Sequence, residues 1–322
     1  QKKILMNSDS PESLSSSQTA WRIYFMSETQ IAYLMLFTAP GMFAVNMLVA
    51  RWMASETPPV ALAFWRWLGV LLLMLLLRGK QLWLHRQQVQ EEWKDLLVLG
   101  SLGMGICGAF VYIGAETTQA TNIGLLYSSS PVMIVLLAWK FYKERLSLRQ
   151  ILGGVICLGG VLWIVMRGSF ETFLNLDLNV GDLWILTAVV SWAVYVVILK
   201  FRPTGMPMST RFTAICLFGS MILLPFYLWE SIMYQTMPVT PDSMTAVALL
   251  VFIAGFGAYQ AYGKAQAVLG AAKGGLILYL NPLYVALMAW LFLGEPLQHY
   301  HYLGAGLILP GIFLVNLPTR TE

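Results

Sequence analysis

Two basic side chains, Arg66 and Lys273, stand within otherwise apolar stretches of the sequence. A charged group at such a position is costly, so it marks a candidate site for an anion unless the side chain reaches polar surroundings near the end of the stretch. Trp65 and Trp67 flank Arg66 and favour the second interpretation for it, with the arginine snorkelling to a polar interface. Glycines and alanines leave space around Lys273, which could therefore bind a carboxylate or a phosphate.

Further polar and aromatic residues follow helical spacing and form candidate ligand-binding positions. A single residue of this kind more often packs helices together, but several of these residues correspond between two halves of the chain. With Lys273, the predicted binding set is Asn122, Asn281, Ser130, Asn46, Tyr195, Trp192, Tyr112, Gln260 and Tyr279.

The remaining reactive residues do not form a catalytic or metal-binding pattern. The three histidines fall at loops or helix ends, and the three cysteines are unevenly spaced within apolar runs. Glu144 and Glu295 each precede a predicted helix, where a carboxylate complements the positive helix start, so we interpret them as caps rather than proton carriers. The sequence thus predicts no catalytic residue, no metal, no cofactor and no disulfide framework.

The chain that must position these residues is far too apolar for a soluble protein. Of its 322 residues 58% are hydrophobic and 11% are charged, and its mean hydropathy is +0.67. Soluble domains carry about 25% charged residues, so a soluble enzyme, a nucleic-acid binder and a disordered protein are all excluded. Runs long enough to cross a bilayer as helices lie at 31–50, 60–77, 96–114, 119–139, 149–167, 182–200, 211–229, 244–262, 268–293 and 299–317.

The lysines and arginines predict the orientation of these ten spans. If the N-terminus is cytoplasmic, 16 of the 20 basic residues fall in cytoplasmic segments, two (Arg51 and Arg167) fall outside, and Arg66 and Lys273 fall within spans. Cytoplasmic loops of membrane proteins carry such an excess. We therefore expect both termini in the cytoplasm, and the short loops suit a bacterial cytoplasmic membrane.

The second half of the sequence repeats the first at an offset of about 150 residues. Pro131 and Glu144 are separated by the same 13 positions as Pro282 and Glu295, and glycines downstream of both glutamates recur at matching steps. Each unit contains five predicted helices, an odd number, so the second unit must enter the membrane from the opposite side. Inverted repeats of this kind are typical of transporters, with a substrate site near the midplane.

The residues of the repeat resemble a known family. The segments GLLYSSSPVMIVLLAWKFYKERLSLRQILGGVICLGG and GGLILYLNPLYVALMAWLFLGEPLQHYHYLGAGLILPG are similar to the two copies of the EamA domain, and the resemblance covers residues 30–317. EamA proteins belong to the drug/metabolite transporter superfamily. The resemblance implies an all-α integral membrane protein of ten helices, in two inverted five-helix repeats around a central cavity, which moves small organic solutes by alternating access. The stretch around Lys273 also resembles a Gly-Ala-Leu-Asn-Lys segment of nucleotide-sugar transporters, whose lysine meets the phosphate-bearing part of the substrate.

The resulting domain organisation has five parts. They are a disordered cytoplasmic segment 1–29, a first repeat 30–167, a linker 168–181, a second repeat 182–317 and a cytoplasmic tail 318–322.

The predicted function is transport of an amino-acid-like or other carboxylate solute, by export or exchange, with Lys273 and Asn122 holding the anionic group. The alternatives are exchange of phosphorylated or nucleotide-linked metabolites, which requires more cationic contacts, and a non-transporting lipid-handling or accessory role. The predicted partners are a small solute and the lipid bilayer, without nucleic acid, and the sequence does not predict an oligomeric state.

Overall fold

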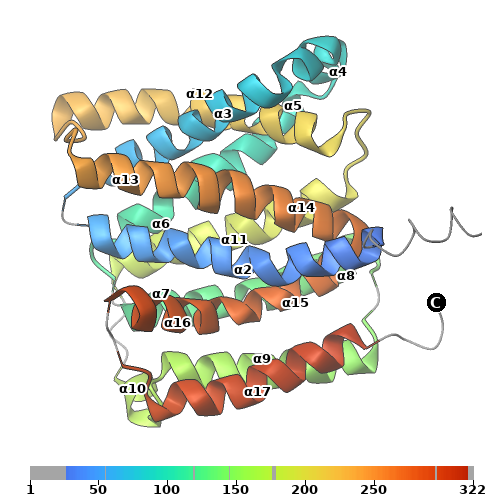
Figure 1. The fold of residues 1–322 in the computed structure, drawn as a ribbon, viewed down its shortest axis with the longest axis vertical. Helices are drawn as coiled ribbons and strands as arrows, with labels where there is room; N and C mark the ends of the chain where they lie inside the picture. Colours follow the sequence, from blue (N-terminus) through green and yellow to red (C-terminus); the bar gives the residue numbers. More distant parts are fainter. Residues whose placement is uncertain are drawn as a thin grey trace, which may run out of the picture.

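The chain forms a bundle of long helices that run roughly side by side (Figure 1). The computed structural model describes residues 27–54, 56–118, 120–144, 146–175, 179–293 and 296–317. The tail 318–322 and nearly all of the predicted N-terminal segment lie outside these residues. All the elements of regular secondary structure within them are helices, so the predicted fold class is confirmed.

The helices of the first repeat follow the predicted spans closely. The linker contains a short helix, α10 (Phe170–Leu174). The elements of the first repeat are α2 (Glu28–Met53), α3 (Pro59–Leu84), α4 (Arg86–Glu91), α5 (Trp93–Leu99), η2 (Gly100–Ile106), α6 (Cys107–Ala115), α7 (Ala120–Ser128), α8 (Ser130–Tyr142) and α9 (Leu148–Val165).

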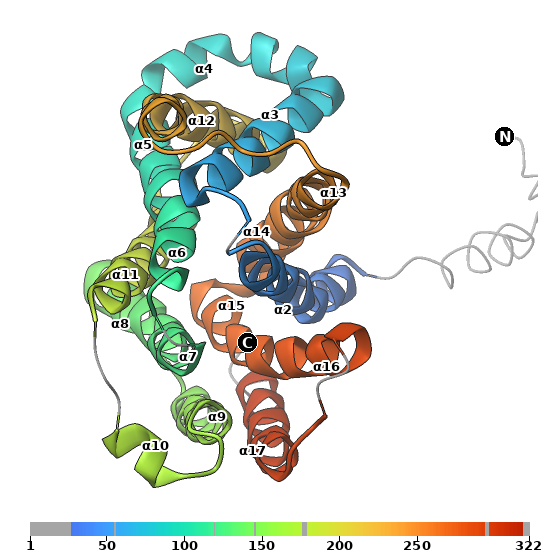
Figure 2. The same ribbon diagram turned by 90° about the vertical axis from the view of Figure 1, so that its left-hand side faces the viewer.

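The second repeat has the same order of long and interrupted helices. Its elements are α11 (Val180–Phe201), α12 (Met208–Met233), α13 (Pro241–Leu249), η3 (Leu250–Gly257), α14 (Ala258–Leu269), α15 (Ala271–Ile277), η4 (Leu278–Leu280), α16 (Asn281–Leu293) and α17 (His299–Asn316). Within the described residues, nine helices or continuous groups of helices are long and apolar enough to cross a membrane. The tenth predicted span is α17, which begins with the polar run His-Tyr-His-Tyr and lies beside α9 (Figures 1 and 2).

Both repeats interrupt the same two helices in the same way. The third helix of each repeat contains a π-helical segment, η2 in the first and η3 in the second. The fourth helix is interrupted before Pro131 in the first repeat and before Pro282 in the second, and proline has no backbone N–H to donate. Irregular helices are tolerated in a membrane where they face protein or a cavity, so these interruptions locate the interior of the bundle.

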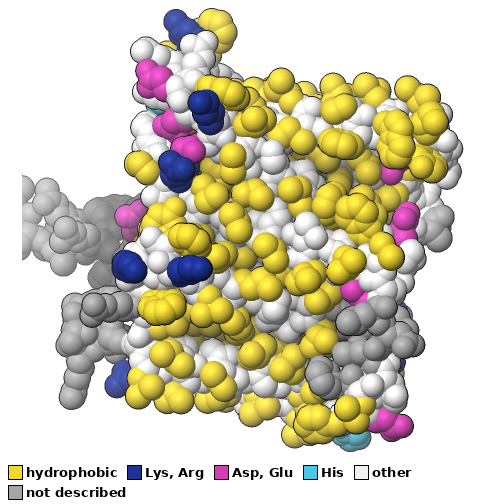
Figure 3. Space-filling model, turned by 180° about the vertical axis from the view of Figure 1, so that it is seen from behind, with side chains coloured by type: hydrophobic (Ala, Val, Ile, Leu, Met, Phe, Trp, Pro, Cys, Tyr) yellow, Lys and Arg dark blue, Asp and Glu magenta, His cyan; other side chains and the backbone are white. Residues whose placement is uncertain are grey.

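Lysines and arginines gather at one end of the bundle, together with some acidic residues, and acidic residues lie at the other end, with a broad apolar surface between them (Figure 3). We call the end around Arg86, Lys143 and Arg202 the basic end, and the end around Glu56 and Glu171 the acidic end. Helix α2 starts at the basic end and α17 finishes there, as an even number of spans requires (Figure 1). The described lysines and arginines near the basic end are Arg78, Lys80, Arg86, Lys94, Lys140, Lys143, Arg149, Lys200, Arg202, Arg211 and Lys264.

Small residues let α9 and α17 pack at backbone distance. A Cβ atom added at Gly153 would lie 2.6 Å from the carbonyl oxygen of Gly311, and one at Gly160 would lie 2.8 Å from that of Gly304. Close approach of backbones is how helices associate strongly in lipid, where the hydrophobic effect offers little. These glycines therefore serve helix packing.

The cap of α9 differs from the prediction. Ser147 caps this helix, since its hydroxyl accepts from the backbone N–H of Gln150 while the Gln150 side chain accepts from the N–H of Ser147. Glu144 lies four residues before the first residue of α9 and is not its N-cap residue. The interpretation of Glu144 as a structural group rather than a proton carrier stays a prediction. Glu295 lies outside the described residues.

Candidate functional site

A cavity of about 540 Å³ lies between the two repeats. Its walls come from α2, α3, α6, α7, α8 and α9 of the first repeat and from α11, α14, η4, α16 and α17 of the second. A volume of this size accommodates a small metabolite rather than a polymer. Helices of both repeats contact the same space, so a movement of one repeat against the other would change its shape.

Aromatic rings form the wall of the cavity on the side of the basic end. Phe43, Trp192 and Tyr259 line it and contact one another edge to face, with ring centroids 5.4 to 5.6 Å apart. Tyr195 stacks on Trp192 one turn closer to the basic end, with centroids 5.5 Å apart. The lining residues of α2 run from Phe43 to Ala54, so the cavity extends from the aromatic rings to the acidic end.

A buried arginine, Arg66 of α3, lines this cavity with only 4% of its surface exposed. Its Nη1 donates to Asn46 Oδ1 at 2.8 Å and to the Tyr112 hydroxyl at 3.3 Å. Its Nη2 donates to the carbonyl oxygen of Ala254 at 3.1 Å, and Tyr112 donates to Asn46 Oδ1 at 2.6 Å. The guanidinium is thereby held by three helices besides its own, all through neutral acceptors.

The structure contradicts the snorkelling interpretation of Arg66. Trp67 beside it is fully buried rather than placed at an interface, and the Arg66 Cζ lies 4.6 Å from the centroid of its ring. Only Trp65 is exposed, as an interfacial tryptophan would be. The prediction failed because it treated the tryptophans on both sides of Arg66 alike, although adjacent residues of a helix face different directions.

Part of the predicted binding set converges on the cavity. Asn46, Ser130, Trp192, Tyr279 and Asn281 line it directly. The buried Ser130 Oγ, Tyr279 hydroxyl and Asn281 Oδ1 make no hydrogen bond within the described structure. Polar atoms left in this state are costly unless a ligand or water reaches them, so they are candidate ligand contacts.

Other members of the predicted set lie elsewhere. Tyr112 does not line the cavity but holds Arg66 and Asn46, while Tyr195 lies behind Trp192. Gln260 points its Nε2 to the sulfur of Met74, 3.5 Å away. Lys273 is half-buried in the first turn of α15, near the basic end, and is not a lining residue. Asn122 belongs to α7, and its side chain lies outside the described part of the structure.

Sequence reasoning missed several residues that face the cavity. Tyr127, Tyr259 and Cys107 all line it, and Arg51 and His301 lie nearer its acidic end. Tyr127 and Tyr259 are two of 14 tyrosines in the chain, and which of them face the cavity depends on how the helices pack, so no local pattern identified them. Cys107 is half-buried and lines the cavity, whereas Cys157 and Cys216 are buried and do not line it.

Carboxylates are placed away from the centre of the cavity. Glu230 of α12 accepts from the backbone N–H groups of Val60 and Ala61, at 3.0 and 2.6 Å, and so caps α3. Glu116 follows α6 at the acidic end, where partial burial raises the pKa of its carboxyl. No group of three or more histidines, cysteines or acids that could hold a metal occurs within the described residues.

Comparisons with known proteins agree with this architecture. The sequence model of the EamA-like transporter family matches residues 30–166 and 179–317. The uncharacterized transporter YyaM of Bacillus subtilis is 25% identical over 286 residues, which cover 88% of this chain and 93% of that protein. A Streptantibioticus cattleyicolor protein named "Probable terminal-alkyne amino-acid exporter" is 28% identical over 232 residues, covering 70% of this chain and 73% of that one. A crystal structure with 19% sequence identity shares the fold, with a TM-score of 0.72 over 89% of this chain and 96% of the other.

Proposed function

The chain belongs to the EamA-like transporter family, and from this we propose that it carries an amino-acid-like or other small carboxylate solute by alternating access. The observation that carries the proposal is the cavity of about 540 Å³ between the inverted repeats, with Arg66 and several unpartnered polar groups on its wall. Inverted repeats that meet around one site are suited to expose it to each side in turn.

We propose that the basic end faces the cytoplasm, in accordance with the excess of lysine and arginine there. Both termini would then be cytoplasmic, and the cavity, which extends to the acidic end, would face outward in this conformation. The Bacillus relative supports the cytoplasmic membrane of a bacterium as the location.

Three observations support this class of solute: the size of the cavity, the positive charge on its wall and the name of one relative. The cavity suits a small metabolite, its deepest cation suits an anionic group, and the Streptantibioticus relative is named for amino-acid export. A phosphorylated or nucleotide-linked solute is less well supported, because the only arginines or lysines among the described lining residues are Arg51 and Arg66. Export and exchange are both compatible with this arrangement.

Counterflow in proteoliposomes tests the proposal. Vesicles loaded with unlabelled L-leucine, its keto acid α-ketoisocaproate or a sugar phosphate receive the radiolabelled form outside, and we expect saturable uptake for a carboxylate. Ala286 lines the cavity and Leu287 next to it is exposed, which provides a matched pair of variants. Ala286→Trp should abolish uptake by filling the cavity, whereas Leu287→Trp should retain it. Uptake of the sugar phosphate alone would favour the phosphorylated class, and uptake equal to empty vesicles for all three would contradict carrier function for these solutes.

A further inference from the structure

The charge of Arg66 has no acidic counterpart in the described structure. The titratable side chains near enough to interact with it are tyrosines and cysteines, among them Tyr112, Tyr259 and Cys107. Its hydrogen-bond acceptors are an amide oxygen, a hydroxyl and a main-chain carbonyl, all of which are neutral. A buried cation is strongly disfavoured unless an anion or a ligand compensates it, so this arrangement calls for an anion in the cavity.

The contacts also hold the guanidinium in one place. Nη1 and Nη2 are held by Asn46, Tyr112 and Ala254, whereas Nε is buried without a partner. Arg66 is at the same time one of the residues that line the cavity. The side chain is therefore held in place by neutral groups, has one donor without a partner, and forms part of the wall of the space that a solute would occupy.

We propose that Arg66 is the residue that binds the carboxylate of the transported solute, with Asn46 and Tyr112 as positioning residues; this inference rests on the proposed function. A planar guanidinium matches the geometry of a carboxylate and forms charge-assisted hydrogen bonds with it. A single arginine at this depth balances one negative charge, which fits a monoanion better than a phosphate dianion. Arg66 replaces Lys273 as the anionic anchor, because Lys273 does not line the cavity.

The rest of the cavity fits the remainder of such a solute. Phe43, Trp192 and Tyr259 offer an aromatic wall for an apolar body. Asn281 Oδ1 and Ser130 Oγ are unpartnered acceptors that could receive hydrogen bonds from an ammonium group. The amino group is recognised separately from the carboxylate in this arrangement, so a keto acid of the same skeleton would still bind through Arg66.

Cys107 provides a probe of the charge near Arg66 that does not depend on transport. This half-buried thiol lines the cavity and interacts electrostatically with Arg66, whereas Cys157 and Cys216 are buried. The purified protein in detergent is treated with anionic sulfonatoethyl or cationic trimethylammonioethyl methanethiosulfonate. In each reaction the thiolate attacks the sulfenyl sulfur, a mixed disulfide forms and methanesulfinate leaves. The ratio of the two rate constants therefore reports local charge, independently of how far the thiol itself is ionised.

The expected result is a preference for the anionic reagent that depends on Arg66. Arg66→Gln should lower the anionic-to-cationic rate ratio by about fivefold or more, as expected for loss of one nearby charge at intermediate dielectric. Cys107→Ser measures the background from the other two thiols. An unchanged ratio in Arg66→Gln would overturn the proposal.

Protection of Cys107 by ligands then tests carboxylate binding. L-Leucine and α-ketoisocaproate should slow labelling of the wild type, and leucinamide, which lacks the carboxylate, should not. Arg66→Gln should lose this protection, and Arg66→Lys should keep the charge ratio but protect less, because a lysine cannot form the paired contact. Protection by leucinamide equal to that by leucine, or retained protection in Arg66→Gln, would overturn the proposal. If carboxylates fail to protect the wild type while the ratio still depends on Arg66, the proposed solute class fails and the anion site stands.

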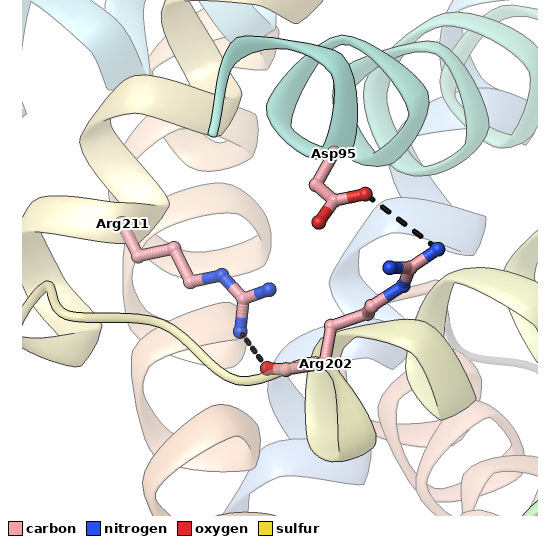
Figure 4. Close-up of polar contacts among 3 residues, drawn as sticks. All are labelled: Asp95, Arg202 and Arg211. Atoms are coloured by element: carbon pink, nitrogen blue, oxygen red, sulfur yellow. Dashed lines mark hydrogen bonds and ion pairs between the residues drawn. The ribbon is translucent and has the colours of Figure 1, made fainter. Parts of the chain in front are cut away.

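The chain offers a matched control for loss of a buried arginine. Arg211 of α12 is 2% exposed, and its Nη1 donates to the carbonyl oxygen of Leu199 near the basic end. The same Nη1 donates to the carbonyl oxygen of Arg202 (Figure 4). It does not line the cavity. Arg211→Gln should therefore leave both the rate ratio and the protection unchanged, even where it lowers the unfolding temperature. If Lys273→Ala rather than Arg66→Gln abolishes protection, Lys273 is the anchor and the proposal is wrong.

Discussion

Glu230 illustrates how a carboxylate can be retained in an apolar helix without serving as a proton carrier. Helix α3 begins at Pro59, which has no backbone N–H, and its first free backbone donors are the N–H groups of Val60 and Ala61. Helix starts leave such donors unsatisfied and carry partial positive charge, so an acceptor from another helix stabilises them. The carboxylate of Glu230 supplies that acceptor from α12.

Replacing Glu230 should therefore reduce stability. We expect Glu230→Leu to lower the free energy of unfolding by about 1–3 kcal/mol, since two backbone donors lose a charged acceptor. The measurement is thermal unfolding in detergent, with the exposed Glu171 changed to Leu as the control. Glu230→Gln keeps one acceptor oxygen, so its free energy of unfolding should lie between those of the wild type and Glu230→Leu. Loss of transport in Glu230→Gln at unchanged stability would instead indicate a role in proton transfer.

The roles of Arg66 and Lys273 could not be separated at the level of single residues. Each is a basic residue in an apolar stretch with small or aromatic neighbours. What distinguishes them is contact with remote segments, since Arg66 bonds to Ala254, 188 positions away, while Lys273 stays near the start of α15. Asn46 was predicted as a site residue from the repeat and Asn281 from helical spacing, and both patterns are visible in the sequence. The partner of a charged group is instead a property of the fold.

At the scale of elements, the pairing of α9 with α17 depends on a row of glycines. Gly153 faces backbone atoms of α17, whereas Gly159 on the same helix has open space where a Cβ would lie. Both residues are therefore glycines of the same helix, and they differ only in whether another helix packs against them.

This pair of glycines allows a controlled substitution. Gly153→Ala should cost roughly 1–3 kcal/mol, because its new methyl group meets a carbonyl oxygen of Gly311 that cannot rotate away. Gly159→Ala should leave stability unchanged or raise it slightly, since alanine favours the helix. Thermal unfolding of both variants in one detergent checks this. Equal effects at the two positions would show that α9 and α17 do not depend on this close contact.

The π-helical segments mark the limit of prediction for elements. The sequence predicted helices over both regions, but it did not predict η2 or η3. Their effect appears only in three dimensions. The carbonyl of Leu102 in η2 accepts from Ser191 of the second repeat at 2.8 Å, and that of Ala254 in η3 accepts from Arg66 of the first repeat. Each interrupted helix thus receives a side chain from the opposite repeat, which connects the two halves beside the cavity.

At the scale of the whole molecule, the order of the spans and their number could be predicted because bilayer thickness fixes helix length. The inverted repeat was equally visible, through the fixed spacing of Pro131 with Glu144 and of Pro282 with Glu295. The direction in which the cavity opens could not be predicted, because inverted halves allow either side to be open. The structure has the aromatic rings of Phe43, Trp192 and Tyr259 on the side of the basic end, so this conformation is closed toward that end.

The orientation of the molecule can be tested with cysteines placed at the two ends. Ala54, an exposed residue that lines the cavity at the acidic end, and Gln90, an exposed residue of α4 at the basic end, are each changed to cysteine after Cys107→Ser removes the cavity thiol. In intact spheroplasts a membrane-impermeant maleimide should label Ala54→Cys and should label Gln90→Cys only after permeabilisation. This result is expected because basic segments are retained in the cytoplasm during insertion. The reverse pattern would place the cavity mouth in the cytoplasm, and the conformation described here would then be the one that takes up solute from inside the cell.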